Sequence, residues 1–550
     1  MTWTLAAPLR RVWGTQPRPR PIPAEPPPPA APPAPVPEVG QHPPPKLKDW
    51  LGVLAMVCGQ FMAIMDVQIV TSSLTQIQGG LSASPDEISW VQTAYLIADV
   101  VMVPLSGTLS RLFSTRVVFA FAAAGFTGAS VLCATATSLD QMIFYRALQG
   151  ASGGSLTPLV FPVIYTKFRQ PQLGQIMVLI SLILNLSSTL GPTVGGYLTD
   201  TLNWHWLFLV NVAPGVLVIV TVWLMIDIDK PDLSLLRNLD VMGLVFMAIF
   251  LASLEYALEE GPRWDWLDDT TIRYAVVAAG VFSTLFFWRV FTYRQPIVEL
   301  RTFKDRNFAL GTFYTFVIGT GLYGATYVIP LFLAEVRGYS AFQIGMIVVV
   351  TGVTQMCMTP FTAYISRKLD LRVMLGIGMG LFAVAMYLTA SLTNQAGFNE
   401  LMVPQIVRGI ALMFCYLPAN LISLSTLGPD RLKNGAGLYN LTRDLGGAIA
   451  LATIGTIMNS RLHFHWNRLI EDVNPARPAV QHFLNGATER FSTVIPGDPH
   501  QAALKLLAMK VQREALVLTF NDVILMMGVL FAVGVILMPL VRNRRSFMAR

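Results

Sequence analysis

Long apolar segments with almost no charged residues recur along this chain, and they restrict it to one kind of fold. Each segment is about 20 residues long, the length that an α-helix needs to cross roughly 30 Å of hydrocarbon. Inside a bilayer, only helices and closed barrels satisfy all of their backbone hydrogen bonds. Hydrophobic residues make up 53% of the sequence and charged residues only 13%. We therefore predict an all-α polytopic membrane protein.

Fourteen of these segments are expected to span the membrane, and an even number places both termini on the same side. Their approximate limits are 50–72, 88–110, 117–136, 139–165, 173–199, 205–226, 240–259, 273–291, 307–334, 341–363, 371–391, 400–425, 434–459 and 519–541.

Lysine and arginine are concentrated in every second short loop, and loops of this kind face the cytoplasm. The set comprises Arg111 and Arg116; Lys167 and Arg169; Lys230 and Arg237; Arg294, Arg301, Lys304 and Arg306; Arg367, Lys368 and Arg372; Arg431 and Lys433; and, after the last span, Arg542, Arg544, Arg545 and Arg550. The intervening short loops at 73–87, 137–138, 200–204 and 392–399 contain neither residue type. Both termini are therefore predicted to be cytoplasmic.

The spans divide into two predicted bundles with a helix pair between them. We expect six helices over 49–226, a central pair with linkers over 227–306, and six more helices over 307–541. An internal repeat supports this division: when Gly150 is aligned with Gly409, a proline follows at nearly the same distance in both segments. Parallel repeats about an axis along the membrane normal are typical of transporters with a central site.

Three polar segments lie outside the spans. Residues 1–48 are rich in proline and cannot bury a core, which predicts a disordered cytoplasmic tail. Residues 542–550 form a short basic cytoplasmic tail. The insert 460–518 is expected on the outer side, as a small helical subdomain, a partner-binding surface or a simple tether.

Ionisable residues within the spans are the first candidates for function. Arg146 lies at membrane depth, where a charge costs about 2.5–3.5 kcal/mol and needs a partner or a role. Asp66, Asp99 and Asp444 are buried carboxyl groups of the kind that bind and release protons. Each also has a structural interpretation: Arg146 bonded to backbone carbonyls, Asp66 and Asp99 in helix-packing hydrogen bonds, and Asp444 in a buried structural ion pair. Arg443 is its sequence neighbour, but neighbours on a helix point about 100° apart and need not pair.

A substrate cavity is expected to be apolar and adaptable, because flexible thioethers and aromatic faces accommodate varied ligands. Gln92 and Tyr95 share a helix face with Asp99 and are candidates to line it. Four further candidate lining residues are Tyr323, Tyr327, Gln355 and Met356.

Glycines of the fifth span are expected to shape the pathway. Gly191 and Gly195 lie four residues apart on one face, with Gly196 beside them and Pro192 in the same run. Small residues let helices approach closely, and proline bends a helix. The run is either an ordinary packing seam or a tight hinge that seals the pathway against proton leakage.

Several function classes are not supported by the sequence. The basic residues form no groove-sized patch for nucleic acid, and there is no GxxxxGK[ST] loop for ATP. A dense catalytic cluster or an attached signalling domain, which an enzyme or a sensor would need, is not visible. We expect no cofactor and no metal site, with the proton-motive force as the energy source.

Several motifs together resemble the major facilitator superfamily, in particular its fourteen-span drug:proton antiporters of the EmrB type. They are FMAIMDVQIV (61–70), RALQG (146–150), LGPTVGGYL (190–198), WHWLFLVNVAPG (204–215), LDVMGLV (239–245) and LRTFKDRNFALG (300–311). The resemblance covers residues 48 to 541. It implies that Asp66 and Arg146 take part in proton coupling, with Gln149, Gly150, Gly191 and Arg443 among the residues that shape conformational change.

The loop after the second span departs from the family pattern. Many relatives have an acidic residue where this chain has Ser110, so this chain lacks the carboxylate of the charge relay proposed for those relatives. Gly107, Arg111 and Arg116 remain to form a tight cytoplasmic turn and to bind lipid headgroups or a neighbouring helix end.

The resemblance implies a proton-driven exporter of hydrophobic small molecules in the bacterial inner membrane. It also implies partnership with a periplasmic adaptor and an outer-membrane channel, with 460–518 as a candidate contact. The main alternative is a transporter of one dedicated metabolite on the same fold.

Overall fold

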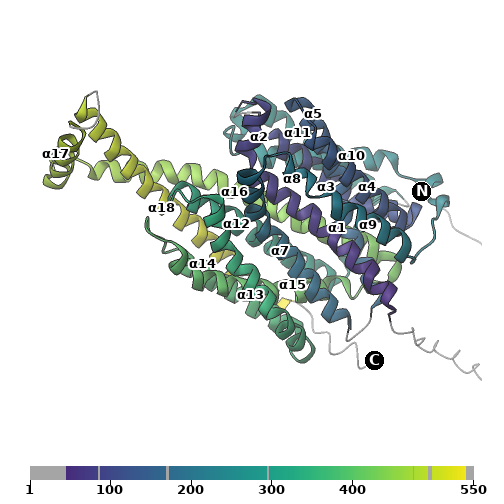
Figure 1. Cartoon of the computed structure of the whole chain (residues 1–550). Coiled ribbons are helices and arrows are strands. Elements are labelled where there is room, and N and C mark those ends of the chain that lie inside the picture. Colours follow the sequence, from purple (N-terminus) through teal and green to yellow (C-terminus); the bar gives the residue numbers. More distant parts are fainter. Residues whose placement is uncertain are drawn as a thin grey trace, which may run out of the picture. The chain divides into compact units, whose positions relative to one another are not determined.

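A computed structural model describes residues 45–84, 87–168, 172–293, 296–474, 476–492 and 498–540, and every regular element in these ranges is a helix (Figure 1). The α-helices are α1 (Leu47–Ser72), α2 (Leu74–Leu81), α3 (Trp90–Phe113), α4 (Thr115–Ala134), α5 (Leu139–Gly153), α6 (Leu156–Lys167), α7 (Gln172–Thr201), α8 (Trp206–Leu209), α9 (Val212–Met225), α10 (Val241–Glu260), α11 (Thr270–Thr292), α12 (Arg306–Glu335), α13 (Ala341–Lys368), α14 (Leu371–Thr389), α15 (Phe398–Leu424), α16 (Pro429–Asp472), α17 (Pro478–Ser492) and α18 (Pro499–Ile536). Short 3-10 helices lie at Leu233–Asn238, Trp266–Asp268, Leu300–Lys304 and Met538–Leu540. The predicted tails fall almost wholly outside the described residues, except that α1 already begins at Leu47.

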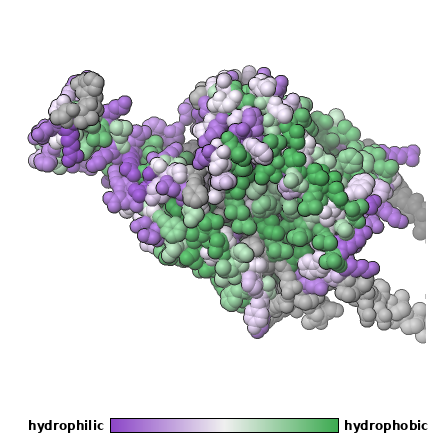
Figure 2. Space-filling model, viewed as in Figure 1, coloured by the Kyte–Doolittle hydropathy of each residue, from purple (hydrophilic) through white to green (hydrophobic). Residues whose placement is uncertain are grey.

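Each of the fourteen expected spans coincides with a helix or a pair of consecutive helices. Within the described ranges, eleven segments are long and apolar enough to cross a membrane. The spans expected at 139–165, 173–199 and 434–459 are also helical, as α5 with α6, α7 and the first part of α16. Apolar side chains cover the middle of the face seen in Figure 2, whereas polar residues gather around α17. The all-α membrane fold is therefore confirmed, and the exact number of spans stays a prediction.

Local sequence signals set the helix ends near the sites discussed below. α3 and α4 are separated by Ser114 alone, whose φ of 78° reverses the chain and whose hydroxyl accepts a hydrogen bond from the Val117 N–H. Asp240 caps α10 by accepting from the Gly243 N–H at 3.0 Å, and it also pairs with Arg289 of α11 at 2.9 Å. The second contact ties the two helices of the central pair together.

Two close helix contacts occupy corresponding positions in the internal repeat. A Cβ added at Gly150 of α5 would lie 2.2 Å from the Tyr95 carbonyl oxygen of α3. A Cβ added at Gly409 of α15 would lie 2.8 Å from the Thr351 carbonyl oxygen of α13. Glycine permits these approaches because it has no side chain to displace the facing backbone.

The insert 460–518 consists of the end of α16, α17 and the beginning of α18. α16 has 44 residues. At a rise of about 1.5 Å per residue it is roughly 66 Å long, about twice the thickness of the hydrocarbon core of a bilayer. α17 packs against α18 through a small apolar cluster that contains Leu484, Ala487 and Ala503.

Candidate proton and substrate site

A fully buried ion pair joins α1 to α5. Nη1 of Arg146 lies 2.6 Å from Oδ2 of Asp66, and both side chains are completely shielded from solvent. The two residues come from separate apolar helices, so each supplies the partner that the other needs in a low-dielectric interior. Asp66 and Arg146, two of the three candidates for proton coupling in the first predicted bundle, thus form one site.

Amide groups complete the hydrogen bonding of the Asp66 carboxylate. It accepts from Nε2 of Gln149 at 3.1 Å and from Nδ2 of Asn211 at 2.8 Å. Gln149 also accepts from Arg146 at 2.7 Å and donates to the Ser130 hydroxyl of α4 at 2.8 Å. The ion pair is therefore held by groups from four neighbouring segments.

Arg146 has structural contacts besides its carboxylate partner. Its Nε donates to the Val91 carbonyl oxygen at 3.0 Å, and its guanidinium carbon lies 4.3 Å from the centre of the Tyr95 ring. Its Nη2 has no hydrogen-bond partner among the described residues. The backbone contact and the ion pair, considered as alternatives at the sequence level, coexist in the structure.

A second ion pair lies in α16. Nε and Nη2 of Arg443 lie 3.1 and 3.0 Å from Oδ1 of Asp444, and the Tyr323 hydroxyl donates to the same oxygen at 3.1 Å. Sequence neighbours point about 100° apart on a helix, but the long arginine side chain bends back to reach its neighbour. The Asp444 side chain keeps 19% of its surface exposed, unlike Asp66.

Asp99 lies near the second ion pair and not the first, and it forms no ion pair itself in the described part of the chain. It is half-buried in α3 and interacts electrostatically with Asp444 and Arg443 of α16. Tyr95, one turn earlier, instead stacks under Arg146, while Gln92 is 8% exposed and its Oε1 has no partner in the described part of the chain. Of the three residues expected on one face, Tyr95 thus contacts the first ion pair, Asp99 lies near the second, and Gln92 has no hydrogen bond to either in the described structure.

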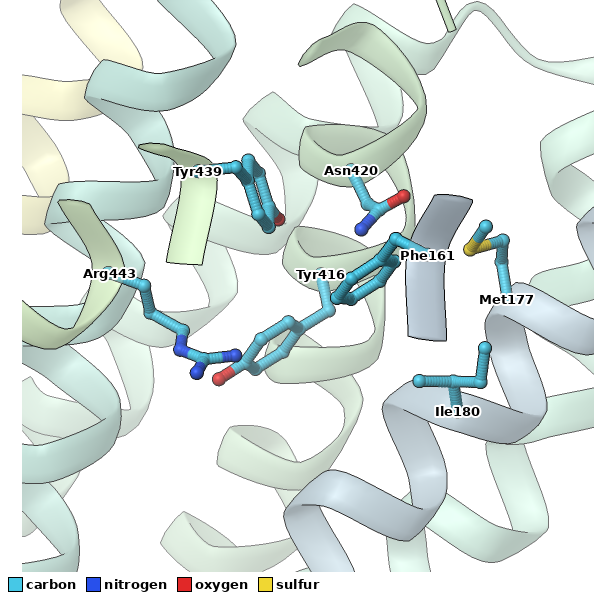
Figure 3. A pocket seen from close by; sticks show the side chains of 7 residues that line it. All are labelled: Phe161, Met177, Ile180, Tyr416, Asn420, Tyr439 and Arg443. Atoms are coloured by element: carbon cyan, nitrogen blue, oxygen red, sulfur yellow. The ribbon is translucent and has the colours of Figure 1, made fainter. Parts of the chain in front are cut away.

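A narrow pocket lies between helices from both predicted bundles (Figure 3). It is lined by Phe161 of α6, Met177 and Ile180 of α7, Tyr416 and Asn420 of α15, and Tyr439 and Arg443 of α16. Figure 3 shows the Tyr416 hydroxyl and the Arg443 guanidinium pointing toward each other. The unfilled space is only about that of one water molecule.

The residues expected to line a cavity are scattered. Tyr323 contacts Asp444, whereas Tyr327 and Met356 are 40% and 62% exposed on the surface. Gln355 is 1% exposed, and its Oε1 lacks a partner within the described ranges. None of these residues is among those that line the pocket in Figure 3.

The glycine run of α7 packs tightly on α1. A Cβ at Gly191 would lie 2.3 Å from Cβ of Gln68, and a Cβ at Gly195 would lie 2.7 Å from the Ser72 hydroxyl. Gly196 is buried beside them, and α7 continues through Pro192. The run therefore forms a close seam between α7 and α1, and its role as a moving hinge stays a prediction.

The turn after α3 meets the beginning of α16. A Cβ at Gly107 would lie 3.0 Å from the Lys433 carbonyl oxygen, and Lys433 also bonds Asp229 and the Ser110 carbonyl oxygen. The Arg111 carbonyl accepts from the Asp232 N–H at 3.2 Å. Arg116 faces the Trp223 ring at 5.6 Å. The turn thus contacts a neighbouring helix end through Gly107 and Ser110.

Some residues of these clusters were not singled out from the sequence. Asn211 lies inside the quoted WHWLFLVNVAPG motif, yet only its bond to Asp66 reveals a role. The only sequence signal for the pocket residues is their spacing: Tyr416 and Asn420 are four positions apart, as are Tyr439 and Arg443. Such spacing places both members of a pair on one helix face.

Sequence comparisons relate this chain to a known family of proteins. A family model described as Major Facilitator Superfamily matches residues 56–451. The chain is 37% identical to the "Colistin resistance protein EmrB" of Acinetobacter baumannii, over 88% of this chain and 94% of that relative. It is 29% identical to the "Multidrug export protein EmrB" of Escherichia coli K12, over 87% of this chain and 93% of the relative.

Solved structures show the same arrangement of helices. The proton:xylose symporter XylE superposes with a TM-score of 0.54 at 13% identity, covering 90% of this chain and 96% of that one. A bacterial homologue of the human lysosomal transporter Spinster gives 0.53 at 13% identity, covering 90% and 98%. The helical membrane fold, the matched family model and the 37% identical relative lead to one conclusion: the chain belongs to the major facilitator superfamily of membrane transporters.

Proposed function

We propose that this chain is a proton-coupled antiporter that exports small hydrophobic molecules, drugs among them, across the bacterial inner membrane. Family membership supports a transporter rather than an enzyme. The names of the relatives, multidrug export and colistin resistance, support drug efflux as the direction and class of transport. The expectation that no cofactor is needed remains part of this proposal.

The buried Asp66–Arg146 pair is the observation that carries proton coupling. A carboxylate that loses its guanidinium partner in a low-dielectric site favours the neutral, protonated form. In our proposal, movement of Arg146 away from Asp66 lets the carboxyl group take up a proton, and return of Arg146 expels it. Conformation thereby controls proton affinity.

The pocket beside Arg443 is the proposed substrate site. It has apolar walls from Phe161, Met177 and Ile180, and polar groups from Tyr416, Asn420 and Arg443. Its small volume supports alternating access, because the surrounding helices have to separate before a drug-sized molecule enters. The hydroxyl of Tyr165 in α6 donates to Asn420 of α15 at 2.8 Å, and this contact would have to open as they separate.

Energy-coupled transport in reconstituted vesicles is the first expected result. A proton that falls through roughly 150 mV releases about 3.5 kcal/mol, enough for a gradient of a few hundred-fold for a neutral solute. A hydrophobic dye should therefore accumulate in inverted vesicles when an acid interior is imposed. If the dye flux does not depend on the pH gradient while the voltage is clamped at zero, the protein is not a proton-coupled antiporter.

A transporter of one dedicated metabolite is the second candidate. The polar groups of Tyr416, Asn420 and Arg443 favour it, because convergent hydrogen-bonding groups make a site selective. A panel of chemically unrelated substrates in the same vesicles separates the two: transport of several supports drug efflux, and transport of one supports the alternative.

We also propose that the insert 460–518 contacts a periplasmic adaptor, which in turn meets an outer-membrane channel. Exposed apolar side chains on its helices support a contact surface: Phe464, Ile470, Leu504 and Met509 are each at least 44% exposed. Apolar groups on an otherwise polar extension are typical of protein interfaces.

Charge substitutions on this extension test the adaptor contact. Phe464→Glu combined with Met509→Glu should lower drug resistance in whole cells at least tenfold, because a buried unpaired charge weakens an interface by more than about 1.4 kcal/mol. Transport by the same variant in vesicles should be unchanged, since no adaptor is involved there. An equal loss of resistance in cells and of transport in vesicles would contradict the contact. Unchanged resistance in cells would contradict it as well.

A further inference from the structure

We propose that Glu255 of α10 is a further proton-carrying carboxyl group of this transporter, brought by the central helix pair against the cluster of Asp99, Asp444 and Arg443. The inference rests on the proton coupling proposed above. It gives the additional pair of helices a direct part in coupling.

α10 packs between one helix of each predicted bundle, α3 and α16. Toward α3, the rings of Trp90 and Tyr256 stack with centroids 5.3 Å apart, and the Thr93 hydroxyl donates to Glu260 at 3.1 Å. Toward α16, the indole N–H of Trp266, in the short 3-10 helix after α10, donates to the Thr456 hydroxyl at 2.8 Å. A displacement of α3 or α16 therefore changes the contacts of α10.

Glu255 is buried without a hydrogen-bond partner. Its residue surface is 5% exposed, and it forms no hydrogen bond or ion pair in the described part of the chain. Glu260, on the same helix and 3% exposed, is bonded by Thr93 and by the indole N–H of Trp264. An ionised carboxylate left unpaired at this depth is costly, whereas the neutral acid is not.

The groups around Glu255 are predominantly acidic. Asp99 of α3 and Asp444 of α16 interact with it electrostatically, as does Glu259 of its own helix, and Arg443 is the cation of the cluster. The charged residues of α11 are engaged elsewhere, Arg289 with Asp240 and Arg273 with the Thr270 hydroxyl.

One guanidinium cannot balance several ionised carboxylates in a low-dielectric interior, so at least one carboxyl group must bind a proton. Asp444 already has Arg443 and Tyr323, and Asp99 also interacts electrostatically with Arg443. Glu255 has the least alternative support of them, because the charged groups that act on it are all acidic. As α3 and α16 approach, Glu255 takes up a proton as the neutral acid. As they separate and water enters, it returns that proton to the solvent.

Glu255→Gln tests the inference because glutamine keeps the shape of the side chain and cannot carry a proton. With an imposed gradient, the substrate accumulation ratio should fall about 50-fold per 100 mV, the equivalent of the ~2.3 kcal/mol that one proton carries. Proton release on substrate addition to purified protein should fall as well. Glu255→Asp should restore both, and Glu260→Gln, on the same helix but already hydrogen-bonded, is the matched control.

The outcomes separate this inference from the proposed function. If the parent protein couples and Glu255→Gln releases the same number of protons per substrate, Glu255 is not a carrier. A variant that only lost thermal stability, with unchanged protons per substrate in the folded fraction, would also overturn the inference. If the parent protein itself shows no dependence on the pH gradient, the proposed antiport fails first.

Discussion

Asp66→Asn should abolish transport driven by a pH gradient and should also destabilise the protein. The substitution removes the only carboxylate bonded to Arg146 in the described structure and leaves a fully buried guanidinium without a counter-charge. Breaking a buried pair from one side costs about 3–5 kcal/mol. Vesicle transport with an imposed gradient measures the first effect, and chemical unfolding in detergent measures the second.

The double variant Asp66→Asn with Arg146→Gln separates coupling from stability. It removes both charges, so most of the lost stability should return, because neutral replacement of a buried pair is often tolerated. Gradient-driven transport should stay absent, since no titratable group remains at this site. A double variant that transported normally would show that Asp66 carries no coupling proton.

Much of the fold and of the first ion pair follows from the sequence. Charge-poor segments of bilayer length dictate helices, and the structure has a helix at each. The sequence marked both Arg146 and Asp66 as candidates, because a charge at membrane depth needs a partner or a role, but it did not pair them; the structure does. The energetic penalty for a buried charge thus identified the two residues, and the packing of α1 against α5 supplied the pairing.

The pocket could not be predicted in the same way, because the energies that select its lining are small. The chain has 31 Phe, 24 Met and 15 Tyr residues, and an aromatic side chain is equally stable against lipid or against another helix. Tyr327 and Met356 lie on the surface, while Tyr416 and Tyr439 line the pocket. Which face of each helix turns inward depends on packing across the two bundles, which the local pattern does not record.

The contact of Arg443 with Asp444 illustrates a second limit. Backbone geometry separates neighbouring positions by about 100°, yet the flexible side chain of Arg443 spans that angle and reaches the Asp444 carboxylate. The same side chain contributes to the pocket wall. Its two roles link the proposed substrate site to the acidic cluster at Asp99 and Glu255, and only the packed helices reveal that link.

Gly107→Leu should trap the transporter with α3 and α16 apart at the end predicted to be cytoplasmic. A Cβ at this position would lie 3.0 Å from the Lys433 carbonyl oxygen and 3.2 Å from Oδ1 of Asn434, so leucine cannot be accommodated without separating the helices. Overpacking costs about 1–3 kcal/mol, which changes the ratio of the two states by roughly 5- to 150-fold. Transport should fall accordingly, because alternating access requires both states.

Labelling of a cysteine at position 110 reports this separation directly. Ser110 is fully buried, and its carbonyl oxygen accepts from Lys433, so a Ser110→Cys thiol should react slowly with a maleimide in a background free of the four native cysteines. Gly107→Leu should speed that reaction, whereas Gly128→Leu should not, because a Cβ at Gly128 of α4 meets only open space.

Unchanged labelling together with lost transport would mean that Gly107 acts within α3 alone. Fast labelling with normal transport would mean that closure at this end is not required for the cycle. Only faster labelling together with lost transport would show that the contact between α3 and α16 works as a gate. That result would also explain how the cytoplasmic end closes with serine, and not an acidic residue, at position 110.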